Sequence, residues 1–240
     1  KLKLTETGMR SYAYAEEIFT KGDELENLLL TGKDSRQQTI RIGVLSTMSR
    51  NFIEVFIAPL ASKPKLRFSL HSGGQAMLLE ALANHQLDLA LTNIEVHGSK
   101  DRLWECQQLA RQPVAVVGPL EVDKKNELSD HYRQQRWVLP INESPIRSAF
   151  DSFCAQQNFR PDTAAEADDM AMLRLLARDT GALAVIPDIV VRDELTSGRL
   201  KHLMTLPNIY ENFYAVTVKR QYPSPLIGEL FKPWLKSQSG

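Results

Sequence analysis

Short apolar segments of two kinds follow one another along the chain from residue 40. In the first kind every second residue is apolar, as in a strand, and in the second kind apolar residues recur every three or four positions, as on one face of a helix. In order they predict strand, helix, strand, helix and strand, at residues 40–45, 52–60, 66–70, 77–82 and 87–92. Helices between successive strands are typical of parallel sheets, so the sequence predicts an α/β fold.

The same alternation begins again in the second half of the chain. Strand patterns occupy residues 137–140, 163–167, 182–186 and 213–218, and helical patterns occupy 145–154, 170–178 and 226–235. Two further strands are predicted at 103–109 and 113–117, before a polar segment at 121–136. We therefore expect two similar α/β lobes in one chain.

The composition is that of an ordinary folded domain. Of 240 residues, 43% are hydrophobic and 24% charged, which excludes disordered, collagen-like and disulfide-scaffold chains. Lys plus Arg and Asp plus Glu both number 29, so the zero net charge gives no overall attraction to nucleic acid or to an anionic membrane. No apolar run is long enough to cross a membrane. Two cysteines, Cys106 and Cys154, make no disulfide framework and favour the cytoplasm.

Residues 5–30 predict one long helix. Thr5 is a candidate N-cap, no proline follows it before residue 31, and the apolar residues form one stripe. The helix would be about 40 Å long and would overhang a domain of this size. We therefore expect the stripe to pair with its own copy in a homodimer, although packing on its own domain is the alternative. The expected dimerisation contacts are Tyr12, Phe19, Leu25 and Leu29.

The catalytic and metal-binding motifs that we considered are absent from the sequence. The chain has no G-x-S-x-G elbow, no phosphate-binding P-loop, no H-E-x-x-H and no C-x-x-C. The five histidines are dispersed, and both cysteines stand where small core residues are expected. We therefore expect neither enzymatic activity nor a cofactor.

Small polar residues and glycines stand where the predicted strands end. Open parallel sheets bind ligands at this edge, and the helix starts that follow offer free N–H groups to an anion or a carboxylate. Helix caps and turns favour the same residue types, so a purely structural role is the alternative. The candidate ligand-binding residues are Ser46, Thr47, Ser72, Gly73, Thr92, Asn93, Asn142 and Pro187.

An acidic cluster, Glu166, Asp168 and Asp169, precedes the predicted helix at 170–178. The plainer interpretation is that Asp168 or Asp169 caps this helix. The alternative is a site for a hard cation, built from the carboxylate oxygens.

Several segments, in their order and spacing, resemble the LysR-type bacterial transcription regulators. Leu4-Thr5-Glu6-Thr7-Gly8 before a long helix is similar to the L-T-x-x-G segment that joins their winged helix-turn-helix domain to a dimerising linker helix. Residues 40–44 are similar to their first effector-domain strand, and residues 72–91 resemble their G-x-x-x-x-L-L…L-D-L-A-I pattern. Residues 180–187 resemble their G-x-G-I-A-x-L-P stretch, with Thr180 and Ala182 in place of both glycines.

A narrower resemblance is to the NhaR group of this family, activators of sodium/proton antiporter genes that respond to sodium and lithium. It rests on residues 166–173 and 208–215. This resemblance adds Glu211 to Glu166, Asp168 and Asp169 as a candidate cation site.

The family resemblance implies an architecture. Two Rossmann-like lobes of the periplasmic-binding-protein type II kind would follow the linker helix and hold a small-molecule or ion effector between them. Two crossing strands, near 113–117 and 213–218, would join the lobes. The implied parts are a remnant of the wing at 1–8, the linker helix at 9–31, lobe I at 39–114 with 213–240, and lobe II at 115–212.

The resemblance also implies a function. The chain would be the sensing and oligomerising part of a regulator whose DNA-reading domain precedes Lys1, since the chain opens without Met. Effector binding would act on DNA through a homodimer or tetramer, with no role for a membrane. The alternatives are an exported solute-binding receptor and an enzyme on the same two-lobe fold.

Overall fold

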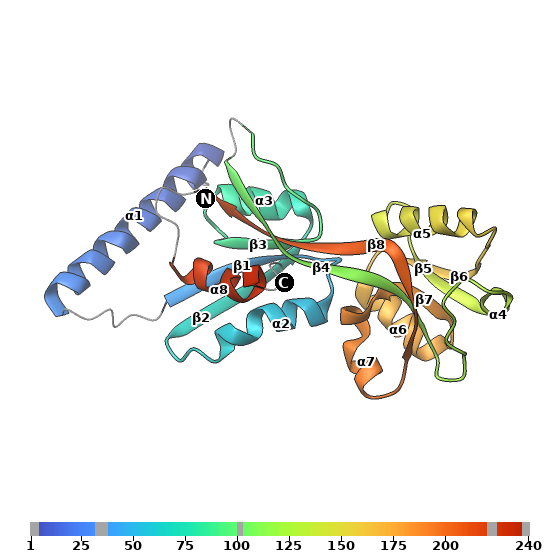
Figure 1. Ribbon diagram of the computed structural model, residues 1–240. Helices are drawn as coiled ribbons and strands as arrows, with labels where there is room; N and C mark the ends of the chain where they lie inside the picture. Colours follow the sequence, from blue (N-terminus) through green and yellow to red (C-terminus); the bar gives the residue numbers. More distant parts are fainter. Residues whose placement is uncertain (1–4, 32–37, 100–102, 220–224, 237–240) are drawn as a thin grey trace.

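The structure, a computed structural model, describes residues 5–31, 38–99, 103–219 and 225–236. Two α/β lobes are joined by two long strands, and a long helix stands beside the first lobe (Figure 1). The elements are, in order, α1 (Glu6–Thr31), β1 (Gln38–Leu45), α2 (Arg50–Ala61), β2 (Leu66–Gly73), α3 (Gln75–Ala83), β3 (Leu89–Thr92), β4 (Trp104–Gly118), α4 (Asp130–Arg133), β5 (Arg136–Pro140), α5 (Pro145–Gln156), β6 (Asp162–Ala167), α6 (Met170–Thr180), β7 (Leu183–Pro187), the 3₁₀ helix η1 (Asp188–Val191), α7 (Arg192–Thr196), β8 (Lys201–Val218) and α8 (Pro225–Lys236).

The described strands form one eight-stranded sheet in the order β2-β1-β3-β8-β4-β7-β5-β6. In lobe I, β1 pairs in parallel with β2 and β3. In lobe II, β5 pairs in parallel with β6 and β7. Between them β8 and β4 run antiparallel to each other and to their outer neighbours, β3 and β7. The predicted parallel pairing within each lobe is confirmed, and the two crossing strands make the whole sheet mixed.

The crossing strands are longer than the sequence pattern predicts. The two strands expected at 103–109 and 113–117 are one strand, β4, whose pairing with β8 shifts register around Leu109 and Val114. The strand expected at 213–218 begins at Lys201, as part of β8. Polar side chains inside both strands, such as Arg111 and Glu211, interrupt the apolar alternation. The sequence pattern therefore does not reveal that each of these segments belongs to one continuous strand.

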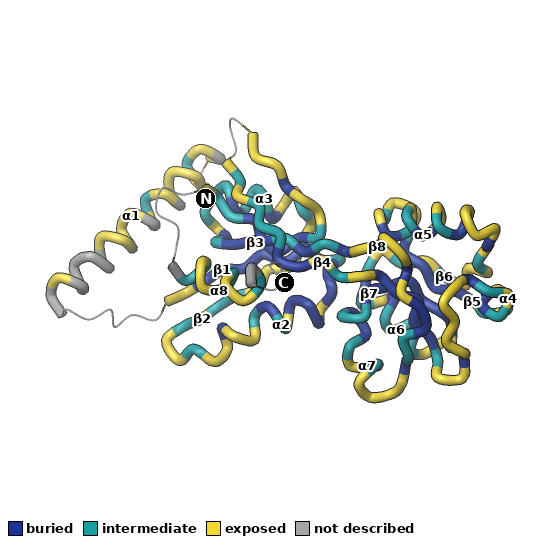
Figure 2. The backbone as a smooth tube through the Cα atoms, in the orientation of Figure 1, coloured by how far each residue is buried: buried dark blue, intermediate teal, exposed yellow. Residues whose placement is uncertain are grey.

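Each lobe has its own hydrophobic core. One core gathers buried side chains from residues 40–110 and 213–230, and the other from residues 114–209. Figure 2 shows these buried segments along the inner strands of both lobes. Phe52 of α2 stacks on Phe213 of β8 with ring centroids 3.8 Å apart, so α2 is fixed against a crossing strand. Burying a side chain of this size stabilises the fold by about 1.5–3 kcal/mol.

Helix α1 contacts lobe I through its first half. The predicted cap is confirmed, because Thr5 Oγ1 accepts a hydrogen bond of 3.1 Å from the Gly8 amide. Arg10 donates to Asn84 at the end of α3, and the Tyr14 ring packs edge-on against His85. No helix among the described residues is long and apolar enough to span a bilayer.

Candidate functional site

The strand ends of the two lobes meet at the boundary between them. Helix α2 starts shortly after β1 of lobe I, and η1 starts directly after β7 of lobe II. Helix α2 contacts η1, so the carboxyl ends of β1 in lobe I and β7 in lobe II lie near each other across this boundary (Figure 1). Ligands of open α/β sheets bind at such edges, which makes this boundary the candidate site.

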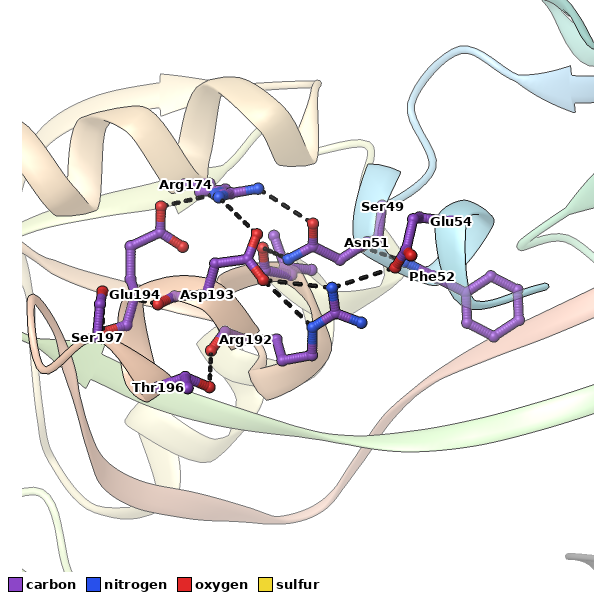
Figure 3. Close-up of polar contacts among 11 residues, drawn as sticks. Ser49, Asn51, Phe52, Glu54, Arg174, Arg192, Asp193, Glu194, Thr196 and Ser197 are labelled. Carbon is purple, nitrogen blue, oxygen red and sulfur yellow. Dashed lines mark hydrogen bonds and ion pairs between the residues drawn. The ribbon is translucent and has the colours of Figure 1, made fainter. Parts of the chain in front are cut away.

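Asn51, in the first turn of α2, ties lobe I to lobe II (Figure 3). Its Nδ2 donates to the carbonyl oxygen of Val190 in η1 at 3.2 Å. Its Oδ1 accepts from Nη1 of Arg174 in α6, also at 3.2 Å. The residue is only 7% exposed; its hydrogen bond to Val190 is buried, and its hydrogen bond to Arg174 is partly buried. A buried amide with both ends bonded across a boundary favours one relative placement of the lobes.

Arg174 gathers the acidic side chains of α7 beside Asn51. Its Nε donates to Glu194 Oε1 at 2.8 Å, and its Nη2 donates to Asp193 Oδ2 at 3.2 Å. Glu194 is only 3% exposed, and its Oε2 has no hydrogen-bond partner among the described residues. A buried acceptor without a partner is rare in folded proteins, and it can receive a donor from a ligand or from water.

A second bridge between the lobes lies nearer the surface. Nη2 of Arg192 in α7 donates to Glu54 Oε2 of α2 at 3.1 Å. Both side chains are well exposed, so this pair adds little to stability. Arg192 also lines a pocket of about 320 Å³ with Gln112 of β4 and Asp188 of η1. We call Asn51, Glu54, Arg174, Arg192 and Glu194 the inter-lobe cluster.

A buried carboxyl group lies where β3 meets the crossing strands. Asn93, directly after β3, donates through Nδ2 to Glu211 Oε1 of β8 at 3.2 Å. Glu211 is 4% exposed, and its Oε2 has no partner in the described part of the chain. Burial raises the pKa of Glu211 to about 7, and the hydrogen bond from Asn93 opposes that rise. This carboxyl group therefore changes charge near neutral pH.

The eight predicted ligand residues lie at or just beyond strand ends, and some of them make hydrogen bonds that hold these ends together. The amide of Ser46 donates to the Gly73 carbonyl at 3.0 Å, which brings the ends of β1 and β2 together. Thr92 Oγ1 accepts from the Ile94 amide at 3.1 Å and so closes the turn after β3. The placements of the remaining residues are as follows: Thr47 in the turn before α2, Ser72 at the end of β2, Asn93 beside Glu211, Asn142 exposed after β5, and Pro187 buried at the end of β7. Their role toward a ligand stays a prediction.

The four carboxylates of the candidate cation site have separate roles. Asp169 caps α6 by accepting from the Ala171 amide at 2.9 Å, which confirms the capping interpretation. Glu166 pairs with Nη1 of Arg147 at 2.6 Å, and Glu211 lies at the crossing strands. The fourth member, Asp168, is exposed just before α6. Across the described ranges no group of three or more His, Cys, Asp or Glu side chains is placed to hold a metal ion.

Sequence reasoning missed the inter-lobe cluster. Asn51 stands at the start of an apolar helix, and Arg174 interrupts the apolar face of another. Such a polar residue inside an apolar segment is the signal that could have pointed to them. Glu194 lies in a segment for which the sequence predicted neither helix nor strand, so nothing marked its carboxylate as buried.

A family model described as the LysR substrate binding domain matches residues 33–236. The chain belongs to this family. The transcriptional activator protein NhaR of Escherichia coli (strain K12) is 20% identical to this LysR-family chain over 236 residues, covering 94% of the chain and 75% of NhaR.

Solved structures of the family share the fold of this LysR-family chain. HinK, a LysR family transcriptional regulator from Pseudomonas aeruginosa, superposes with a TM-score of 0.62 at 19% identity, covering all of this chain and 84% of HinK. The effector binding domain of QuiR in complex with shikimate gives a TM-score of 0.55 at 19% identity, covering 82% of this chain and 95% of that domain. The predicted fold class, two Rossmann-like lobes of the periplasmic-binding-protein type II kind after a long helix, is confirmed.

Proposed function

We propose that this chain senses a small effector between its two lobes and passes the signal to DNA as part of an oligomeric LysR-type regulator. The observation that carries the proposal is the inter-lobe cluster at the facing strand ends. The polar groups of this cluster bond across the boundary, so their positions depend on how the two lobes are placed. A ligand that binds these groups more tightly in one lobe arrangement than in another therefore shifts the equilibrium between the arrangements. We infer no catalytic activity and a cytoplasmic location, because the relatives are regulators that act on DNA.

The strand ends offer both donors and acceptors to an effector. Ser46, Thr47 and Thr92 carry hydroxyl groups, and helix α2 begins shortly after Ser46 and Thr47, whereas the residues described directly after Thr92 form no helix. These groups suit a small organic acid, and the QuiR domain was solved with shikimate. The unpaired oxygens of Glu194 and Glu211 suit a hydrogen-bond donor or a cation instead. The resemblance to the NhaR group places sodium and lithium beside organic acids as effector candidates.

Exposed apolar side chains on helix α1 support the proposal that the chain forms a homodimer. Tyr12, Phe19 and Leu29 are 61%, 72% and 76% exposed on this helix, whereas the side chain of Leu25 lies outside the described ones. Large apolar side chains in a row on an exposed helix are typical of an unpaired coiled-coil face. We propose that a second copy covers them, and that a DNA-reading domain joined before Lys1 is thereby paired.

The thermal midpoint of the chain tests the effector site. Sodium and lithium are compared with potassium and choline at fixed ionic strength, beside a panel of small carboxylates. A ligand at about 100 times its dissociation constant stabilises the fold by about 2.7 kcal/mol. Thr47→Ala and Thr92→Ala are expected to reduce this response more than they reduce stability without ligand.

Thr163→Ala is the matched control, because Thr163 is an exposed hydroxyl on β6. An effector response that survives both strand-end variants would contradict the proposed site. Variants that only lower stability, with the response unchanged, would show that these hydroxyls are turn and cap residues.

A further inference from the structure

The last helix of the structure, α8, contacts α2 at its start and also just beyond its end. The Trp234 ring lies 5.1 Å from the Phe52 ring and 6.0 Å from the Phe56 ring, measured between ring centroids. Beyond the end of α2, Lys63 Nζ pairs with Glu229 Oε2 at 2.6 Å. The aromatic contact therefore joins α8 to the first two turns of α2, which carry both α2 residues of the inter-lobe cluster.

Phe52 connects α8 to a crossing strand. Its ring stacks on Phe213 of β8, with the two planes 9° apart, and meets the Trp234 ring at 50°. Phe52 and Phe213 are both fully buried. Aromatic pairs stabilise beyond the area that they bury, and close-packed rings leave little room for displacement. Phe52 is thus held by β8 and α8 together.

Asn51 comes directly before Phe52 and shares its helical turn. Figure 3 shows the Asn51 side chain pointing toward Arg174 of lobe II and the Phe52 ring pointing away from that lobe. Backbone hydrogen bonds make a helical turn move as a unit, so a displacement of Phe52 also displaces Asn51. Both inter-lobe bonds of Asn51 are already 3.2 Å long. A displacement of about 0.5 Å would therefore take them out of hydrogen-bonding range.

We propose that Trp234 is a positioning residue for the contact between the lobes. Through Phe52 it holds the first turn of α2 at the place from which Asn51 reaches η1 and α6. Trp234 packs against the core of lobe I, yet it sets how firmly lobe II is held. The inference rests on the role proposed for the inter-lobe cluster, and it needs no effector.

Native-state hydrogen exchange of the whole chain, without effector, tests the inference. Trp234→Ala is expected to speed exchange at residues 188–194 of lobe II by about fivefold or more, as the loss of one hydrogen bond would. Trp234→Phe keeps a ring at this position and is expected to exchange there nearly as the wild type does. The double variant Asn51→Ala/Trp234→Ala is expected to exchange there no faster than Asn51→Ala alone, because Trp234 acts through Asn51.

Two variants separate positioning from a general loss of stability. Leu82→Ala leaves a cavity in the same lobe I core, from a fully buried position on α3. It is expected to destabilise lobe I without a selective effect at residues 188–194. Glu229→Gln removes only the exposed pair with Lys63 and is expected to leave exchange at 188–194 unchanged.

Three results would overturn the role of Trp234. The first is unchanged exchange at residues 188–194 in Trp234→Ala while residues 50–56 exchange faster. The second is an effect at 188–194 no larger than that of Leu82→Ala, and the third is additive effects in the double variant. Unchanged exchange at 188–194 in Asn51→Ala would instead refute the role of the inter-lobe cluster, and this inference with it. If Trp234→Ala does not fold, Trp234→Leu replaces it, with the same order of results expected.

Discussion

At the residue scale, Glu211 predicts how stability depends on pH. Burial raises its pKa to about 7 from an ordinary value of 4.5, so between these pH values the folded chain keeps a proton that the unfolded chain has released. The free energy of unfolding therefore falls as pH rises through this window, by roughly 3 kcal/mol in total. Glu211→Gln is expected to remove this part of the slope, measured by urea unfolding at about pH 5 and about pH 8.

Glu121→Gln is the control for this measurement, because Glu121 is an exposed carboxylate in a turn. Glu121→Gln is expected to leave unchanged the difference in the free energy of unfolding between the two pH values. The same slope in wild type and Glu211→Gln would show that this carboxyl group is not the source of the pH dependence.

Arg174 predicts a second effect at this scale. Arg174→Met would leave Glu194 buried with neither oxygen paired, because Nε of Arg174 is the partner of Oε1. Removing one member of a buried ion pair costs about 3 kcal/mol or more, and urea unfolding measures it. Arg178→Met, one turn later in α6, removes a pair with the exposed Asp179 and is expected to have little effect. Equal losses in the two variants would contradict the role assigned to Glu194.

The candidate site was predictable from the sequence only in part. The polar residues at strand ends could be found, because strand patterns stop at recognisable positions such as Thr92. Asn51 could not be paired with its partner, because Val190 lies 139 positions away along the chain. The burial of Glu211 depends on how β8 crosses between the lobes, which the local pattern around the residue does not specify.

At the scale of elements, the apolar stripe of α1 predicts self-association. Phe19 is 72% exposed, so replacing it with a charged residue should cost the single chain little. Phe19→Asp is expected to raise the dimer dissociation constant by about tenfold or more, since a charge cannot be buried between paired helices without cost. Sedimentation velocity over a range of concentrations measures it. Gln134→Asp, an exposed position of lobe II, is the charge control. A wild-type chain that stays monomeric would contradict the prediction outright.

The elements themselves differ in how well the sequence predicts them. Helix α1 and the parallel strands have long regular patterns, and they form where the patterns place them. In the crossing strands β4 and β8, polar residues replace part of the apolar alternation. The full length of these two strands therefore becomes visible only in the sheet.

At the scale of the whole molecule, the inter-lobe cluster predicts an equilibrium between lobe arrangements. Asn51→Ala removes the bonds to Val190 and Arg174 without touching the crossing strands. Because each such bond contributes about 1 kcal/mol, local opening should increase by about tenfold or more. Native-state hydrogen exchange should become faster at residues 50–54 and 188–194, and stay slow in the buried strands of both lobes.

Glu54→Gln separates this effect from a general loosening of α2, because it disturbs only the exposed pair with Arg192. It is expected to leave hydrogen exchange nearly unchanged, since exposed ion pairs contribute little.

An effector that favours the closed arrangement should slow exchange at the same segments in the wild type, and less so in Asn51→Ala. If Asn51→Ala exchanges as the wild type does, the crossing strands alone set the lobe arrangement. An effector would then have to act through the hinge, where Glu211 and Arg111 lie on opposite faces of the same two strands.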